Sequence, residues 1–513
     1  MGKNLFNSVK MSKPKKNVFD LTHDVKLSTD IGNLTPILTM ECVPGDKFDL
    51  SCESMIRLAP MTAPVMHRMD VTMHYFFVPN RILWDNWEKF ITDANSGIVW
   101  PHLSSVAFEA QNATDAKGQQ SRKTADYLGV PPPPDDSTPT EINALPFAAY
   151  QCIYNEYYRD QNLVAPINYK LTDGSNAGSW ERIRELCNLR NRAYEHDYFT
   201  SSLPFAQKGP AVDIPLGQVE LNDSTDVGLF KDAFNHASTL SGAVTSFTPG
   251  QLQVNSTNAV YDPNGTLEVQ PTTINELRRA FRLQEWLEKN ARGGTRYIEN
   301  ILSHFGVKSS DARLQRPEYI TGTKSPIIIS EIVQSGESNL TPQGNLAGHG
   351  ISVTSGRSGS YYCEEHGYII GIMSIMPKTA YQQGIPKTFL KNDPLEYFWP
   401  SFAHIGEQEV QQQELYAYQP DATNTFGYVP RYSEYKYMPS RVAGDFRTSL
   451  DYWHLGRIFE EGPQLNEEFI TCYPQNNSRI FAVEDPDAQK LYCHVLNKIK
   501  AVRPMPKYGT PTF

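Results

Sequence analysis

The pattern of hydrophobic and polar positions near the start of the chain predicts antiparallel strands. Over residues 70–78 the two kinds of side chain alternate loosely and then become wholly apolar, which is typical of a strand entering a core. A Pro-Asn pair ends this strand, and Asn80 is placed to cap a helix over residues 82–91. Upstream, segments 35–43 and 47–58 are strand-like and are separated by a Pro-Gly-Asp turn.

The middle of the chain predicts helices that carry recognisable start signals. Pro146 suits the first turn of a helix whose aromatic side chains recur at three- and four-residue steps. A serine that can act as an N-cap precedes an expected helix over residues 180–194. Thr273 opens a capping box before a helix over residues 274–292, and a shorter helix over residues 297–305 follows.

The C-terminal part returns to strand-like patterns. The expected strands are 326–334, 361–376, 468–473, 479–483 and 490–502. The Gly-containing run 348–359 lies between two of them and is expected to be a flexible loop. Because strands at the two ends of a chain must pair to form one core, the pattern favours a mainly β sandwich or jelly roll with long insertions.

The expected layout of the chain is discontinuous. It comprises a basic N-terminal arm (1–33), core strands with loops (34–92 and 321–513), helical and loop insertions (93–212 and 272–320) and an excursion (213–271). The excursion is rich in Ser, Thr, Asn, Gly and Asp and poor in long apolar side chains, so it cannot supply much of a core. Asp262, Asn264 and Gly265 belong to a predicted hairpin turn in it, and we expect an exposed surface loop.

Basic residues are concentrated at the two ends of an acidic chain. The net charge of the 513 residues is −10, yet the stretches 1–16 and 498–513 contain lysine or arginine and no acid. Two basic ends on an acidic body suggest contact with an anion, and a solvated, disordered terminus is the alternative. The residues expected to make that contact are Lys13, Lys15, Lys16, Lys498, Lys500 and Arg503.

No constellation of residues predicts catalysis, a cofactor or a metal. Cys363 and His366 have a metal-like spacing but lack further ligands at suitable positions, and the Gly-containing run lacks the lysine of a phosphate loop. Arginines around the 274–292 helix are expected to pair with its own glutamates, and DNA contact is the alternative. The seven irregularly spaced cysteines suggest free thiols and a reducing compartment, and neither a signal peptide nor an apolar run of membrane-spanning length is present.

Three long segments carry a family resemblance. They read MTAPVMHRMDVTMHYFFVPNRILWDNWEKFIT at 61–92, HDYFTSSLPFAQKGPAV at 196–212 and ARGGTRYIENILSHFGVKSSDARLQRPEYI at 291–320. In this order they resemble the major capsid protein of the gokushoviruses, small tailless single-stranded DNA phages of the microvirus family. The resemblance runs from about Val18 to the C-terminus.

The resemblance implies a fold, a function and a set of partners. The implied fold is an eight-stranded antiparallel jelly-roll barrel of the viral capsid type, with long loops and helices grafted between strands. The implied function is that of a subunit that assembles with copies of itself into a T=1 icosahedral shell around circular single-stranded DNA. The basic ends named above would then face the DNA, and the excursion with Asp262, Asn264 and Gly265 would form the threefold protrusion that meets a bacterial receptor.

Further partners implied by the resemblance are a small basic internal DNA-binding protein, a scaffolding protein and a pilot protein. No membrane insertion is expected, and the protein would reside in the virion after assembly in the host cytoplasm. The alternative that the residues leave open is a β-barrel carbohydrate-binding protein or a cupin-like enzyme. Such a protein would have a discrete pocket with clustered acids, histidines or tryptophans, and the seven tryptophans of this chain do not cluster.

Overall fold

The computed structural model describes most of the chain and divides it into two compact units. The described residues are 15–93, 97–210, 212, 273–333, 346–356, 358–483, 485 and 487–508, together with the backbone of four short strands between 219 and 269. One unit consists of Met1–Ala206 with Thr295–Phe513, and the other is Gln207–Gly294. We describe each unit by itself.

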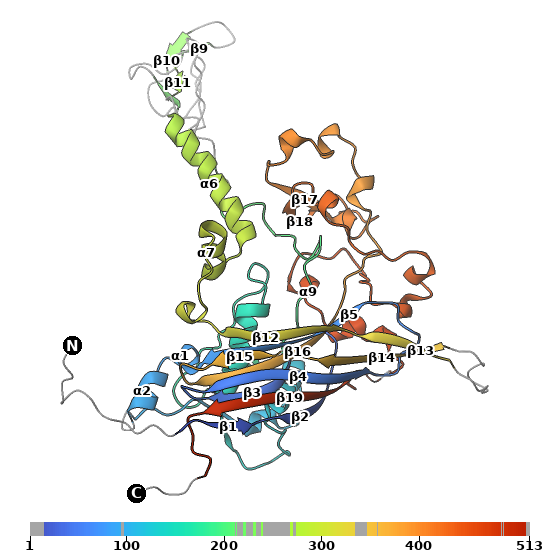
Figure 1. Ribbon diagram of the computed structural model, residues 1–513. Coiled ribbons are helices and arrows are strands. Elements are labelled where there is room, and N and C mark those ends of the chain that lie inside the picture. Colours follow the sequence, from blue (N-terminus) through green and yellow to red (C-terminus); the bar gives the residue numbers. More distant parts are fainter. Residues whose placement is uncertain are drawn as a thin grey trace, which may run out of the picture. The chain divides into compact units, whose positions relative to one another are not determined.

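Two antiparallel sheets form the centre of the first unit (Figure 1). The seven-stranded sheet has the order β1–β19–β4–β14–β13, with β2 also paired to β19 and β15 also paired to β4. The four-stranded sheet has the order β12–β5–β16–β3. The strands are β1 (Asn17–Asp20), β2 (His23–Thr29), β3 (Thr35–Cys42), β4 (Lys47–Leu58), β5 (Met69–Pro79), β12 (Glu318–Pro326), β13 (Ile328–Val333), β14 (Leu346–Ser355), β15 (Gly359–Tyr362), β16 (Gly367–Pro377) and β19 (Leu491–Arg503). The protein is therefore mainly β with antiparallel sheets, as the sequence pattern predicts.

The two sheets pack face to face around a shared core. Side chains of β4 and β19 are alternately buried and exposed, so every second residue reaches the core. Phe48 and Ile56 of β4 and Val495 of β19 are buried in the same cluster as Met73 and Tyr75 of β5. Segments from the two ends of the chain thus supply one core, because β19 pairs with β4 and β16 pairs with β5.

Helices cover the other face of the four-stranded sheet. Strands β5 and β16 are buried on both faces, which explains their continuous apolar sequences. Phe76 and Ile370 pack in a second cluster with Phe147 and Tyr150 of α4. The helices of this unit are α1 (Asn80–Leu83), α2 (Trp87–Thr92), α3 (Ala116–Leu128), α4 (Leu145–Ile153), α5 (Trp180–Cys187), α7 (Tyr297–Phe305), α8 (Ser433–Lys436) and α9 (Glu467–Ile470), and a small hairpin pairs β6 (His102–Ser104) with β7 (Glu141–Asn143).

A third cluster lies in the long connection between β16 and β19. There, β17 (Glu407–Gln411) pairs with β18 (Thr425–Pro430). Val410 and Phe469 of this connection are buried together with Phe199 of the segment that follows α5, so the connection and that segment share a small third core. Loops with such a core can present a defined surface.

Several local expectations are wrong, and the reasons are physical. Asn80 does not cap a helix; it is the first residue of α1, and the expected helix is split into α1 and α2. The run 348–359 is not a flexible loop, because β14 occupies most of it and pairs with β4. A Cβ on Gly348 would lie 2.4 Å from the Ala63 oxygen, so this glycine serves a close approach of two backbones.

Other expected boundaries also change. The strands expected at 468–473 and 479–483 do not form: their first residues belong to α9 and to a 3₁₀ helix, Pro474–Ile480, and Thr471 and Phe481 make only isolated β-bridges. Strand β12 was not predicted. The expected arm is described from residue 15, and from Asn17 it contributes β1 and β2, which pair with β19, so this part is sheet rather than arm.

The second unit contains the long helix α6 (Ile274–Gly293). Its start agrees with the sequence pattern, because the Thr273 side chain accepts a hydrogen bond from the Glu276 amide and the Glu276 side chain accepts one from the Thr273 amide. In the excursion, β8 (Val219–Leu221) pairs with β11 (Leu267–Val269), and β9 (Leu229–Lys231) pairs with β10 (Ala237–Thr239). Asp262, Asn264 and Gly265 lie outside the described residues.

We expect Gly32→Ala to lower the free energy of unfolding by roughly 2–5 kcal/mol. Gly32 has φ +90°, and a Cβ there would lie 2.0 Å from the Cys472 backbone oxygen. Gly129→Ala is the matched control, since Gly129 has φ +107° but nothing within 4 Å of the added Cβ. The control should lose only about 1–2 kcal/mol. Denaturant titration of both variants measures the difference, and equal losses would contradict the steric argument.

Candidate nucleic-acid interface

Strand β19 and the segment just before β1 carry the described basic residues that the sequence singled out. The two ends of the chain meet at the seven-stranded sheet, because β1 pairs with β19 in the register Asn17 to Arg503. The Asn17 side-chain amide also donates a hydrogen bond to the Met505 oxygen, at 2.7 Å. The described residues at the two ends of the chain, Asn17 and Arg503 to Met505, therefore lie side by side.

The N-terminal lysines lie just before β1. Lys15 and Lys16 are exposed, and Lys13 lies outside the described residues. Lys16 donates a hydrogen bond to the Gly45 oxygen at 3.2 Å, and its ammonium lies 5.6 Å from the centre of the Tyr362 ring. Lys15 keeps its charge available at the surface.

The C-terminal cations are matched by carboxylates. Lys498 forms an ion pair with Glu53 on the neighbouring strand β4. Arg503 pairs with Asp46 at 2.9 Å, and Asp46 is fully buried. Lys500 is exposed, but its register neighbours on both sides, Asp20 and Asp49, are acids. The positive charges of these three residues are thus largely balanced by nearby carboxylates. The sequence pointed to the strand that carries basic residues, but not to the cations on its sheet that lack acidic partners.

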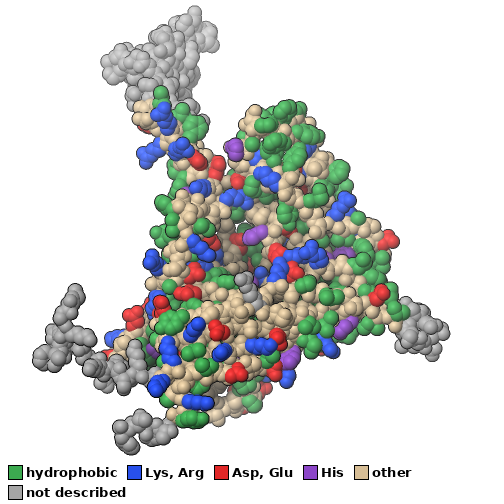
Figure 2. All heavy atoms as spheres, viewed as in Figure 1, with side chains coloured by type: hydrophobic (Ala, Val, Ile, Leu, Met, Phe, Trp, Pro, Cys, Tyr) green, Lys and Arg blue, Asp and Glu red, His purple; other side chains and the backbone are tan. Residues whose placement is uncertain are grey.

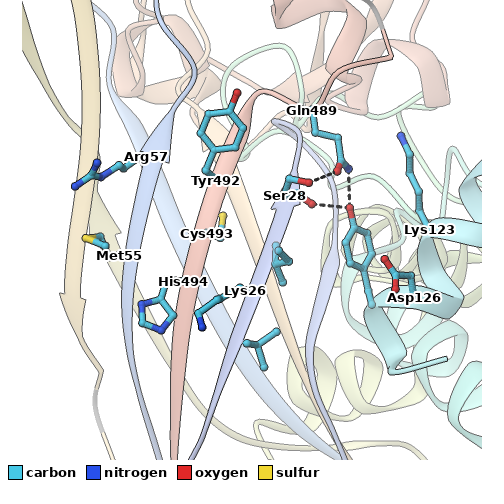
Figure 3. Close-up of a pocket in the computed structure, with 13 residues that line it drawn as sticks. Lys26, Ser28, Met55, Arg57, Lys123, Asp126, Gln489, Tyr492, Cys493 and His494 are labelled. Atoms are coloured by element: carbon cyan, nitrogen blue, oxygen red, sulfur yellow. Dashed lines mark hydrogen bonds between the residues drawn. The ribbon is translucent and has the colours of Figure 1, made fainter. Parts of the chain in front are cut away.

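A groove at the other end of β19 carries cations without such partners. It has a volume of about 830 Å³. It is lined by Val25, Lys26, Leu27, Ser28, Met55, Arg57, Lys123, Asp126, Tyr127, Gln489, Tyr492, Cys493 and His494 (Figure 3). These residues come from β2, β4, β19, the turn before β19, and α3.

Strand register orders the floor of this groove. On β19, Tyr492 lies between Arg57 of β4 and Ser28 of β2. Two residues further along β19, on the same face, His494 lies between Met55 of β4 and Lys26 of β2. The His494 ring also lies 2.9 Å from a carboxylate oxygen of Asp24.

Hydrogen bonds fix the wall of the groove beside α3. The Tyr127 hydroxyl donates to the Ser28 oxygen at 2.8 Å, and the Gln489 amide donates to the Tyr127 hydroxyl at 2.6 Å (Figure 3). Burial raises the pKa of Tyr127 to about 12. Lys123 and Asp126 stand on the same helix, and burial raises the pKa of the Asp126 carboxyl. Tyr492 is 48% exposed, so its ring is accessible from the groove.

The loops between β16 and β19 present a different kind of surface. Figure 2 shows hydrophobic side chains gathered over the region of β17 and β18. We call the following exposed residues the aromatic loop surface: Phe389, Leu395, Tyr397, Phe398, Trp399, Ile405, Tyr435 and Met438. Beneath it, Lys391 pairs with Glu434 at 2.7 Å, and both side chains are almost fully buried. A braced apolar surface of this kind is typical of a protein–protein contact.

Within the described part of the chain, the other motifs form no chemical site. No group of three or more His, Cys, Asp or Glu residues there could hold a metal ion, and no helix there is long and apolar enough to cross a membrane. All seven cysteines are free and buried, as expected from their spacing. Burial raises the pKa of the Cys472 and Cys493 thiols to about 12. On α6, Arg282 pairs with Glu285, which is the bond type expected for this helix.

An antiparallel β sandwich with a charged sheet face and an apolar loop surface defines a structural protein that acts through its surfaces. The chain matches the family "Capsid protein (F protein)" over residues 7–513 and belongs to it. It is 34% identical to capsid protein VP1 of Chlamydia phage 1, over 99% of this chain and 97% of that one. It is 36% identical to VP1 of Bdellovibrio phage phiMH2K, over 97% and 95% of the two chains. It is 28% identical to VP1 of Spiroplasma virus 4, over 99% and 97%.

These comparisons confirm the resemblance read from the sequence. The three relatives are capsid proteins of gokushoviruses, so the chain is a structural protein of the virion and not an enzyme. The alternative of a carbohydrate-binding protein or cupin-like enzyme is thereby set aside.

We expect Arg503→Gln to lower the free energy of unfolding by about 3–5 kcal/mol, because it leaves the buried Asp46 carboxylate without its cation. Lys498→Gln should cost less than about 1 kcal/mol, since its pair with Glu53 is exposed. Denaturant titration checks both values. The double variant Asp46→Asn/Arg503→Gln should recover part of the loss. A small effect of Arg503→Gln would mean that the pair is not structural.

Proposed function

We propose that this protein is the major subunit of a T=1 icosahedral shell that encloses circular single-stranded DNA. The proposal rests mainly on the match to the capsid protein family over nearly the whole chain. The fold supports this proposal because it exposes two extended surfaces for contacts, the aromatic loop surface and the outward face of the seven-stranded sheet. In this proposal, the protein is made in the cytoplasm of a bacterial host and resides in the virion.

The strand order supports a jelly roll as the organisation of the sandwich. Counting β1 with β2 as one strand and β13 to β15 as one, eight strand positions follow in chain order. Positions 1 to 8 are then β1 with β2, β3, β4, β5, β12, β13 to β15, β16 and β19. The seven-stranded sheet has the order 1–8–3–6 in these positions, and the four-stranded sheet has the order 2–7–4–5. Consecutive strands alternate between the sheets, except for positions 4 and 5, which are neighbours in one sheet, and this is the pattern produced when two Greek keys fold over one another.

Contacts between copies of this chain would bury the aromatic loop surface. Phe389 is 77% exposed and Met438 is 91% exposed in the single chain. Leaving such side chains in water is unfavourable, and repeated subunit contacts of ordinary size would remove them from it. The bracing by the buried Lys391–Glu434 pair favours a surface that is formed before assembly.

The enclosed DNA would be held electrostatically at the basic ends. Lys13, Lys15 and Lys16 remain the proposed contacts of the N-terminal arm, because a few lysines per subunit release counterions from the DNA and give sequence-independent affinity. At the C-terminal end the proposal narrows to Lys500, which lies beside Asp20 and Asp49 but forms no ion pair with a described residue, since Lys498 and Arg503 are paired with Glu53 and Asp46. A small basic DNA-binding protein, a scaffolding protein and a pilot protein complete the proposed set of partners.

The excursion, residues 213–271, is proposed to form the threefold protrusion and to contact the host receptor through the turn at Asp262, Asn264 and Gly265. Its composition supports this, because a segment with few long apolar side chains is free to vary without disturbing a core.

Co-expression of the chain with its phage partners should yield particles of about 3.5 MDa, the mass of 60 copies of a 57.9 kDa chain. Size-exclusion chromatography and electron microscopy measure this, and nuclease-protected DNA in the particles reports enclosure. Replacing Lys13, Lys15 and Lys16 with Gln should lower DNA content more than shell yield. Lys89→Gln, at an exposed position on α2, is the control. A monomer or small oligomer under all assembly conditions would refute the shell.

Exchange of residues 213–271 for the matching segment of a relative should transfer the adsorption range of the donor phage while leaving particle yield within about twofold, because an exposed loop adds little to the core. Adsorption assays on both host strains measure the change. Retention of the original range by well-formed particles would rule out the receptor role. Loss of particles would instead place this segment in assembly.

A further inference from the structure

We propose that the groove between β2, β4, β19 and α3 binds single-stranded nucleic acid, with a base stacked on Tyr492 and the flanking phosphates bound by Arg57, Lys26 and Lys123. This inference rests on the proposed function, since it names the place where the subunit would hold the enclosed DNA. None of these four residues was singled out by the sequence analysis.

The first argument is charge. Arg57 and Lys26 are exposed, Lys123 is half-buried, and none of the three makes an ion pair or side-chain hydrogen bond with a described residue. Asp126 is the one acid that lines the groove, and Asp30 outside the lining interacts electrostatically with Lys123, so Arg57 and Lys26 supply the excess positive charge of the lining. This differs from the C-terminal end of the same strand, where Lys498 and Arg503 are neutralised by protein carboxylates. Cations without protein partners are available to an external anion.

The second argument is spacing. Arg57 on β4 and Lys26 on β2 lie on opposite sides of β19, two strand spacings apart across the sheet and two residues apart along it, which separates their backbones by about 12 Å. Tyr492 stands on the strand between them, on the same outward face, and Lys123 lies on α3 at the other side of the groove, while the Arg57 side chain extends to the side away from α3 (Figure 3). An aromatic ring flanked by cations matches the arrangement that binds a stacked base together with the phosphates on either side of it.

The third argument concerns the alternatives. A protein partner would need an apolar centre depleted in charge, whereas the exposed floor of this groove alternates Tyr492 and Met55 with Arg57, Lys26 and His494. Duplex DNA offers phosphates, but its bases are stacked on one another and are not free to stack on Tyr492. The groove therefore favours single strands, and because every base has a stacking face, it does so without sequence preference.

The test is binding of a fluorescently labelled 15-nucleotide oligothymidylate to the full unassembled chain, measured by anisotropy over a range of salt concentrations. The triple variant Lys26→Gln/Arg57→Gln/Lys123→Gln should raise the Kd at least tenfold. It should also reduce the slope of log K against log salt by about 2, as expected for three lost phosphate contacts on a single strand. Arg68→Gln and Lys89→Gln, at exposed positions outside the groove, should leave the Kd within twofold.

The tyrosine is tested separately. Tyr492→Leu should weaken binding about fivefold or more without changing the salt slope, whereas Tyr492→Phe keeps the stacking face and should bind within twofold of the parent. This pair also keeps the proposal falsifiable if the triple variant fails to fold. Unchanged affinity in the triple variant, equal affinity of Leu and Phe variants, or equal binding of a 15-base-pair duplex would each overturn the inference.

The outcome is separable from that of the proposed function. If particles enclose DNA but the groove variants bind the oligonucleotide as the parent does, the groove assignment fails and the shell proposal stands. If the groove variants lose binding in the predicted way but no particle encloses DNA, the groove assignment stands and the shell proposal fails.

Discussion

The placement of the last strand, β19, is the constraint on which the rest of the structure depends. It lies between β4 on one side and β1 and β2 on the other, so it joins the two ends of the chain in one sheet. The side chain of its Asn497 is fully buried and links the two sheets. The side-chain oxygen of Asn497 accepts a hydrogen bond from the Tyr75 hydroxyl, and its side-chain nitrogen donates one to the Ile37 backbone oxygen, both at 2.9 Å. Loss of this register would leave buried polar groups unpaired, which costs more than the bonds contribute.

The same strand couples the core to the outward surface. Because side chains alternate along a strand, Val495 and Ile499 can face the core only if Tyr492, His494 and Lys498 face outward. A slip by one residue would exchange the two sets. The arrangement of the groove is thus set by the requirements of packing inside the sandwich, and the pairing of β19 with both neighbours holds its floor in place.

The segments inserted between the core strands have two structural roles, covering a sheet face and presenting a contact surface. Helices α1, α3, α4 and α5 cover the outer face of the four-stranded sheet, so β5 and β16 are buried on both sides. The connection between β16 and β19 shares a small core with Tyr198 and Phe199 and presents the aromatic loop surface. A capsid subunit needs several independent contact surfaces on one stable core, and long loops grafted on a sandwich supply them without altering its hydrogen-bonded ladders.

The sequence by itself determined the elements whose signals are local. The boundaries of β4 and α7, the capping box of α6 and the cap of α5 follow from alternation, periodicity and side-chain chemistry, and three long segments were enough to identify the family. Tertiary structure alone decided which cations are free. Lys498 and Arg503 appear unopposed in the sequence, but their carboxylates lie 445 and 457 residues away. The groove was not predictable for the same reason, because Arg57, Tyr492 and Ser28 become neighbours only through strand pairing. Local periodicity carries no information about such register.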